Sequence, residues 1–181
     1  MLNLPIDQHW TLFLDRDGVI NKRIFGGYIL EESAFVFNEG AREALTILNK
    51  VFGKIVVVTN QQCIGKKLIS IDQLNQIHNL MCTQIATTGG RIDAVYFAPE
   101  LKNEANSTRK PNAAMALQAK KDFPEIDFST SVMIGDTDSD IIFGKNLGMK
   151  TGLILSEEVV TEQADFRFNS LLDFALCFDS H

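Results

Sequence analysis

The chain has 181 residues, of which 45% are hydrophobic and 22% charged, and its net charge of −6 corresponds to a pI near 5.0. This length fits a single domain over 1–181, and the acidic balance argues against nucleic-acid or anionic-membrane partners, which favour basic surfaces. No apolar run approaches the roughly 18 residues of a membrane span, and residues 1–9 lack the pattern of a signal peptide. We therefore expect a cytoplasmic globular protein.

The first expected strand, at 10–14, runs directly into Asp15-Arg16-Asp17-Gly18. Carboxylates at positions i and i+2 of extended backbone point to the same side, so Asp15 and Asp17 can act on one bound group. Gly18 permits a sharp turn after them. An ordinary polar turn after a strand would give the same four residues, so this motif alone does not decide the function.

The rest of the chain alternates strand-like and helical patterns. The apolar residues of 39–52 fall on one helical stripe, and Ser70 with Gln73 forms a capping-box signature. Strand-like runs occur at 10–14, 54–59, 92–97, 131–135 and 151–155. This alternation predicts an α/β fold, a Rossmann-like three-layer sandwich with a central parallel sheet. The gaps at 21–37 and 98–108 are too short for a lid domain, so we expect a capless protein with an open site.

Polar groups follow several of the expected strands. Thr59 ends the second one, Lys110 precedes a helix-prone run, and Gly135-Asp136 opens a stretch that reaches Asp140. Ligands of open α/β sheets bind at the carboxyl ends of the strands, so these residues are candidates for one site. Taken singly, each has another interpretation: a turn at Thr59, a solvated lysine at 110, and a helix N-terminus at 136–140.

The ordered set D-x-D-G, Thr, Lys and G-D-x-x-x-D resembles the haloacid dehalogenase (HAD)-type phosphohydrolases. The resemblance implies hydrolysis of a phosphate ester through an aspartyl-phosphate, with Asp15 as the nucleophile. Asp17 would protonate the leaving oxygen and then activate water. Thr59 and Lys110 would hold phosphoryl oxygens.

The cluster of acidic residues requires a cation, because Asp15, Asp17, Asp136 and Asp140 would otherwise repel a phosphate dianion. A hard ion with oxygen ligands answers this, and Mg²⁺ is the expected cofactor. By the resemblance, its ligands are the Asp15 carboxylate, the Asp17 backbone carbonyl and Asp136. Asp140 would support the site without binding the metal.

Longer matches point to one branch of this superfamily. D-R-D-G-V-I-N, T-N-Q and R-K-P resemble the histidinol-phosphate phosphatases and the D-glycero-D-manno-heptose 1,7-bisphosphate 7-phosphatases. The G-G-Y at 26–28 and the F-x-F-x-x-G at 35–40 extend the likeness to the heptose enzymes. The resemblance implies substrate contacts from Asn60, Gln61, Arg109 and the segment around Gly27 and Tyr28.

One feature of that branch is missing. Its members carry a zinc loop built from cysteine and histidine, and the matching positions here are Ala98, Glu100, Asn106 and Thr108. None is a usual structural zinc ligand, so we expect no zinc and a loop held in another way. The position after Asp136, often basic in the branch, is Thr137.

The favoured hypothesis is a Mg²⁺-dependent phosphatase of a small sugar phosphate, with a heptose bisphosphate as the first choice of substrate. The alternative is a histidinol-phosphate phosphatase. A non-catalytic HAD-like binding protein is less favoured, because it predicts loss of Asp15, Asp17, Lys110 or Asp136, and all four are present. The expected partner is a small phosphorylated metabolite, and a homo-oligomer is left open.

Overall fold

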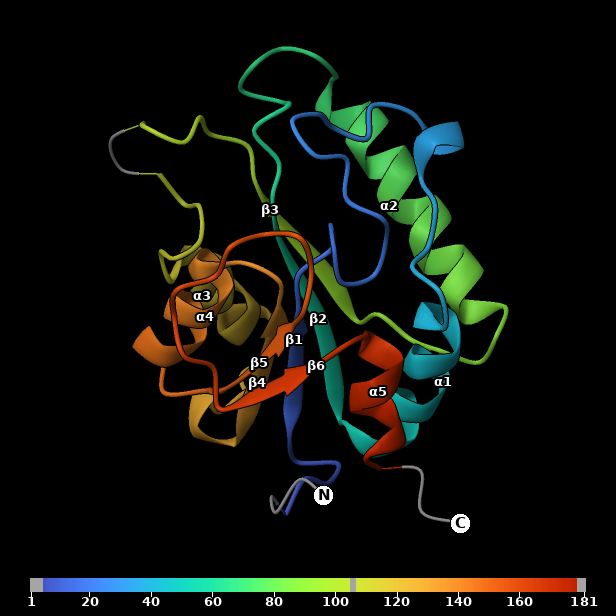
Figure 1. Ribbon diagram of the computed structural model, residues 1–181, viewed down its shortest axis with the longest axis vertical. Helices are drawn as coiled ribbons and strands as arrows, with labels where there is room; N and C mark the ends of the chain where they lie inside the picture. Colours follow the sequence, from blue (N-terminus) through green and yellow to red (C-terminus); the bar gives the residue numbers. More distant parts are fainter. Residues whose placement is uncertain (1–4, 105–106, 179–181) are drawn as a thin grey trace.

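The protein has a central six-stranded sheet in which every neighbouring pair of strands is parallel (Figure 1). The computed structural model describes residues 5–104 and 107–178. The sheet order is β3-β2-β1-β4-β5-β6. The strand bounds are β1 Thr11–Leu14, β2 Lys54–Asn60, β3 Ala94–Ala98, β4 Ser131–Gly135, β5 Lys150–Ile154 and β6 Phe166–Phe168.

Helices cover both faces of the sheet, which gives the three layers expected of a HAD-like α/β fold (Figure 1). On one face α1, α2 and α5 pack in one apolar cluster, and on the other α3 and α4 pack in a second. The helix bounds are α1 Ala41–Val51, α2 Ile71–Ala86, α3 Ala114–Asp122, α4 Asp138–Asn146 and α5 Leu171–Leu176, with 3₁₀ turns at Glu32–Ala34 and Phe128–Thr130.

The pleat of the central strands explains why both faces are filled. Side chains of a strand alternate between faces, and here Leu12 and Leu14 join the α1–α2–α5 cluster while Phe13 joins the α3–α4 cluster. All four residues of β1 are buried. A strand buried on both faces reads as a continuous apolar run, which is the signal that predicted it.

The five expected strands are all present, with ends that differ by at most two residues. The capping box at the start of α2 is confirmed: the Ser70 hydroxyl accepts from the N–H of Gln73, and the Gln73 side chain accepts from the N–H of Ser70. The sixth strand, Phe166–Phe168, and α5 were not expected from the sequence. No helix within the described residues is long and apolar enough to span a membrane.

The strand order also determines where a ligand can bind. The chain moves from β1 to β2 and β3 on one side, and returns to β4, β5 and β6 on the other. Doubly wound sheets bind ligands at such a reversal, beyond the carboxyl ends of the strands. Between β1 and α1, a stretch that the structure describes in full, the only helix is the 3₁₀ turn at Glu32–Ala34, so no large cap is inserted there.

Candidate active site

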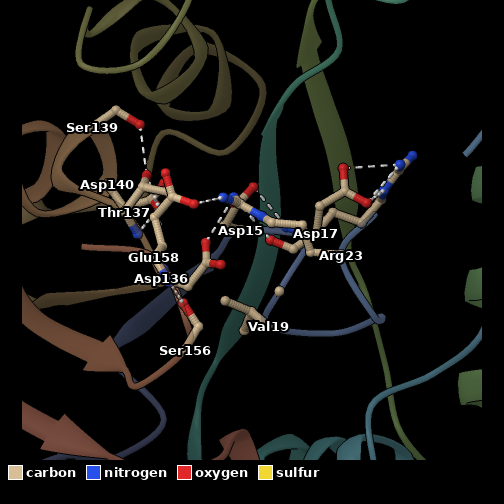
Figure 2. A network of polar contacts seen from close by, with 12 residues as sticks. Asp15, Asp17, Val19, Arg23, Asp136, Thr137, Ser139, Asp140, Ser156 and Glu158 are labelled. Atoms are coloured by element: carbon tan, nitrogen blue, oxygen red, sulfur yellow. Dashed lines mark hydrogen bonds and ion pairs between the residues drawn. The ribbon is translucent and has the colours of Figure 1, made fainter. Parts of the chain in front are cut away.

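Two aspartates leave the sheet side by side because β1 and β4 are paired in register. Leu14 lies opposite Ile134, and the N–H of Asp15 donates to the Ile134 carbonyl at 2.9 Å, so Asp15 and Asp136 follow at the same edge. Carboxylate oxygens of Asp15, Asp136 and Asp140 lie within 4.8 Å of one another. In Figure 2 Asp15 lies between Asp17 on one side and Asp136 and Asp140 on the other.

Two glycines allow this close approach. A Cβ at Gly18 would lie 2.0 Å from Asp136 Oδ2, and the φ of Gly18, +93°, is itself unfavourable for other residues. A Cβ at Gly135 would lie 2.1 Å from the Cβ of Asp140. These glycines of the D-x-D-G and G-D motifs therefore serve the packing of the aspartates.

Lys110 is the buried cation of the cluster. Its Nζ lies 2.9 Å from Asp15 Oδ1 and 2.6 Å from Asp140 Oδ1, and its side chain is 1% exposed. Burial alone would lower the pKa of Lys110, but Asp140 and Asp15 raise it above its ordinary value. Lys110 is therefore charged, and it compensates two carboxylates at once.

Asn60 and Asp140 hold other parts of the site in position. The Asn60 side chain accepts from the N–H of Lys110 at 2.9 Å and donates to its carbonyl at 3.3 Å. Asp140 Oδ2 accepts from the N–H of Asp136 and from the N–H and hydroxyl of Thr137. Since the other oxygen of Asp140 faces Lys110, both oxygens are engaged, which favours the expected supporting role.

The Asp17 carboxylate is turned toward a separate polar group. Arg16 Nη2 donates to its two oxygens at 2.9 and 3.0 Å, and Asn21 and Gln61 each donate at 2.9 Å. Burial alone would raise the pKa of Asp17, but Arg16, together with the hydrogen bonds from Asn21 and Gln61, holds it below the ordinary value. Arg16 in turn lies 3.0 Å from Nε2 of the buried His78.

The expected phosphate- and substrate-binding residues line a single cavity of about 1230 Å³. Gln61 donates to the Thr59 hydroxyl at 2.8 Å, and Gln62 donates to the Tyr28 hydroxyl at 2.9 Å. The expected site residues that line this cavity are Asp15, Asp17, Gly27, Tyr28, Thr59, Asn60, Gln61, Arg109 and Lys110. Asp136 and Asp140 are fully buried and lie outside that lining.

The carboxylates suit a hard divalent cation. Burial raises the pKa of Asp15 to about 6 and that of Asp136 to about 8, so positive charge beyond that of Lys110 and Arg23 is needed to keep Asp136 ionised at neutral pH. Asp136 Oδ2 is buried and has no hydrogen-bond partner among the described residues. Oxygens of this type and number fit Mg²⁺.

These pKa values predict how stability without metal depends on pH. The folded protein holds the Asp136 proton up to about pH 8, whereas the unfolded chain releases it near 3.8. The folded state therefore binds more protons, and the free energy of unfolding in EDTA should fall as pH rises from about 6.5 to about 8, by at most about 1 kcal/mol per pH unit. Chemical denaturation at several pH values measures this slope.

Two other groups contribute at the lower end of this window. Asp15, with a pKa of about 6, adds to the fall, whereas His78 opposes it, because burial lowers its folded pKa to about 3 while the unfolded chain releases that proton near the ordinary value of 6.5. Asp136→Asn is the control that isolates Asp136, and it should remove the fall above about pH 7. A wild-type stability that stays level or rises across this window would contradict the assignment of the raised pKa to Asp136.

The segment at the position of the related branch's zinc loop is joined by hydrogen bonds. The Thr108 hydroxyl lies 2.7 and 2.9 Å from the two oxygens of Glu100 and donates to that carboxylate. Arg109 Nη1 donates to the Glu100 carbonyl at 3.1 Å. Ala98 is buried at the end of β3, and Asn106 lies outside the described residues. The two ends of the segment therefore meet through Glu100 and Thr108.

Two arginines were not predicted as site residues. Arg16 has its side chain buried against Asp17 and His78, and Arg23 Nη2 lies 3.0 Å from Asp136 Oδ1. Arg16 lies inside the D-x-D motif, and this position could have indicated that it belongs to the site. Arg23 lies in an irregular segment six residues beyond Asp17, and nothing in the sequence links it to Asp136.

Comparison with known proteins agrees with this geometry. Residues 107–171 match the model of the HAD-hydrolase-like family. The D-glycero-alpha-D-manno-heptose-1,7-bisphosphate 7-phosphatase of Mycobacterium tuberculosis is 34% identical over 171 residues, which cover 92% of this chain and 90% of the relative. The enzyme of the same name from Burkholderia mallei is 39% identical over 155 residues, covering 81% and 80%.

Solved structures show the same fold. The D,D-heptose 1,7-bisphosphate phosphatase of Burkholderia thailandensis superposes with a TM-score of 0.67 at 29% identity, covering 94% of this chain and 99% of that one. The B. bronchiseptica enzyme, complexed with magnesium and phosphate, has a TM-score of 0.83 at 22% identity, covering 92% and 96%.

Together the fold and the aspartate–lysine site define a phosphatase of the HAD superfamily, a phosphoric monoester hydrolase. The relatives that are more than 30% identical over most of their length narrow the assignment from the superfamily to one of its branches. The chain belongs to the D-glycero-D-manno-heptose-1,7-bisphosphate 7-phosphatase branch of that superfamily.

Proposed function

We propose that this phosphatase removes the 7-phosphate of a D-glycero-D-manno-heptose 1,7-bisphosphate, with Asp15 as the nucleophile. The observation that carries the proposal is the convergence of Asp15, Lys110 and Asp136 at the β1–β4 edge, in a chain whose relatives bear that enzyme name over most of their length.

The orientation of Asp15 supports its role. The N–H of Arg16 and the Nζ of Lys110 both contact Asp15 Oδ1, at 2.7 and 2.9 Å. These contacts fix the carboxylate and leave Oδ2 without a hydrogen bond from the described residues. Oδ2 would attack phosphorus as the bond from phosphorus to the sugar oxygen breaks, and the phosphoryl group would pass to Asp15.

Asp17 is proposed to move the protons. It would deliver a proton to the leaving sugar oxygen, then accept one from the water that attacks the phospho-aspartate, so that inorganic phosphate is released and Asp15 regenerated. Its lowered pKa keeps Asp17 ionised, which is the form that can accept the proton in the second step. Gln61, which donates both to Asp17 and to Thr59, would hold the two residues in a common position.

Mg²⁺ is proposed to bind the Asp15 carboxylate, the Asp17 carbonyl and Asp136, where it would neutralise charge on the phosphoryl oxygens. The B. bronchiseptica relative was solved with magnesium and phosphate. Thr59 and Lys110 would contact the same phosphoryl group, since both line the cavity beside Asp15.

The second phosphate of the substrate has cations available to it. Lys66, Lys102 and Arg109 line the same cavity as Asp15. Lys66 Nζ lies 5.1 Å from the centre of the Tyr28 ring, and Arg109 is held by the Glu100 carbonyl. A guanidinium pairs well with a phosphate, so these three cations should strengthen the binding of a bisphosphate more than that of a monophosphate.

The test is phosphate release from both anomers of the heptose 1,7-bisphosphate, from a heptose 7-phosphate and from histidinol phosphate. We expect the highest kcat/KM with one of the bisphosphate anomers, and a 1-phosphate as the only sugar product. Arg109→Ala should raise KM for the bisphosphate about tenfold and that for the 7-phosphate less. Arg167→Ala, on β6, is the control and should change neither.

One outcome would contradict the proposed substrate, and another would contradict the role of Arg109. Faster hydrolysis of histidinol phosphate than of either bisphosphate anomer would favour the alternative substrate. Equal effects of Arg109→Ala on the bisphosphate and the 7-phosphate would remove Arg109 from the site of the second phosphate, even if the bisphosphate is the preferred substrate.

A further inference from the structure

Arg23 contacts two of the groups that are proposed to bind the metal. Its Nη2 lies 3.0 Å from Asp136 Oδ1 and 3.4 Å from the backbone carbonyl of Asp17. Those two groups are proposed Mg²⁺ ligands, and Mg²⁺ binds its oxygens at about 2.0–2.1 Å. A guanidinium hydrogen-bonded to both fills the space in front of Asp136 Oδ1 and the Asp17 carbonyl, so the arginine and an ion bound to these two oxygens exclude each other, while Asp136 Oδ2 has no such partner among the described residues.

The cavities around the site lead to the same conclusion. Asp136 does not line the main cavity that holds Asp15 and Lys110, but it lines a second one of about 530 Å³. Arg23 lines both cavities, and its side chain is 22% exposed whereas that of Asp136 is fully buried. The guanidinium thus lies between Asp136 and the main cavity, and an ion that is shared by Asp15 and Asp136 Oδ1 and enters from that cavity needs it to move.

A second acidic residue offers Arg23 another partner. Glu158 Oε2 lies 3.5 Å from Arg23 Nη1 and is partly exposed at the cavity wall. The segment that carries Glu158 is hydrogen-bonded to the start of α4, because the Asp138 carboxylate accepts from the N–H groups of Thr161 and Glu162. Figure 2 shows Arg23, Asp136 and Glu158 in one network.

We propose that Arg23 is a built-in competitor of Mg²⁺: it binds Asp136 and the Asp17 carbonyl itself, and it yields them to the metal by turning to Glu158. The inference rests on the metal ligands of the proposed function. Its consequence is that the enzyme needs more Mg²⁺ to fill the site than the carboxylates alone would require.

The experiment measures Mg²⁺ binding by calorimetry on the full chain, without substrate. Arg23→Gln removes the competing charge and should lower the Mg²⁺ dissociation constant by about tenfold, which corresponds to about 1.4 kcal/mol. Arg23→Lys keeps the charge but cannot bridge both oxygens as a guanidinium does, so its dissociation constant should lie between the two. Lys22→Gln removes a neighbouring exposed charge and should stay within about twofold of wild type.

Thermal unfolding provides a readout that needs no binding model. In EDTA, Arg23→Gln should melt below wild type, because Asp136 loses its charged partner. In saturating Mg²⁺ the two should melt alike, so the metal-induced rise in Tm should be larger for the variant. Glu158→Gln should weaken Mg²⁺ binding in the wild-type chain more than in the Arg23→Gln chain, since only in the former does Glu158 receive the displaced arginine.

An unchanged or weaker Mg²⁺ affinity in Arg23→Gln and Arg23→Lys would overturn the proposal. If affinity is unchanged while KM for substrate rises, Arg23 contacts the phosphate instead. If wild type itself binds no Mg²⁺ in the millimolar range, the proposed metal site fails, which is a different result from the failure of this inference.

Discussion

Asp15→Asn should lose at least about 10³-fold in kcat while the protein keeps its fold, because an amide is a poor nucleophile. The substitution is nearly isosteric, and an amide oxygen can still accept from the N–H of Arg16 and from Lys110. Removing a carboxylate that burial makes costly to ionise should leave the melting temperature equal to or above that of wild type. Steady-state phosphate release and thermal unfolding measure the two effects.

A trapping experiment separates the nucleophile from a merely electrostatic role. Wild type quenched in acid during turnover of a radiolabelled substrate should retain label that hydroxylamine removes, as an acyl phosphate does, and Asp15→Asn should retain none. Asp138→Asn is a matched control on the same cavity wall and should be labelled. More than about a tenth of wild-type activity in Asp15→Asn, with Mg²⁺ saturating, would rule out the nucleophile role.

Lys110→Met should abolish activity and also destabilise the protein by about 3–5 kcal/mol, because it leaves Asp15 and Asp140 buried without their shared cation. This dual effect distinguishes Lys110 from a lysine that only binds substrate. Denaturant unfolding at neutral pH measures the loss. Lys121→Met, at an exposed position at the end of α3, is the control and should change neither quantity.

A second substitution tests the cause of that instability. In a Lys110→Met chain, Asp140→Asn removes one of the uncompensated charges and should restore part of the stability without restoring activity. The same Asp140→Asn change in the wild-type chain should be destabilising, because Lys110 and the Thr137 cap lose an ionised partner. If the effects of the two substitutions on the free energy of unfolding are additive, the stabilisation by Lys110 does not depend on Asp140, and this explanation is wrong.

The sequence predicted the part of the structure that depends on local patterns. Continuous apolar runs identified five strands, and their polar ends, from Asp15 to Asp136, were expected at one edge because the carboxyl ends of parallel strands meet there. Strand β6 was missed because three half-buried or exposed residues, Phe166–Phe168, carry too little apolar signal. Helix α5, with six residues, is too short for a periodic pattern.

The orientation of individual side chains could not be predicted from the sequence. Position alone put Asp17 with Asp15, but Arg16, Asn21 and Gln61 determine where its carboxylate points. Asn60 was expected to contact substrate. In the structure its side chain is hydrogen-bonded to the backbone of Lys110, a contact that the sequence did not indicate. Arg23 and Asp136 are 113 positions apart, and such a pairing is created only by the folded chain.

The Glu100–Thr108 hydrogen bond has a consequence for the conditions that this enzyme can withstand. Oxidants attack thiolates and chelators remove zinc, but a carboxylate and a hydroxyl are sensitive to neither. Burial alone would raise the pKa of Glu100, yet the Thr108 hydroxyl and neighbouring N–H groups hold it below the ordinary value, so the carboxylate stays ionised in mild acid. We therefore expect the Glu100–Thr108 hydrogen bond to be insensitive to oxidants and chelators, and strong acid to be the condition that opens it.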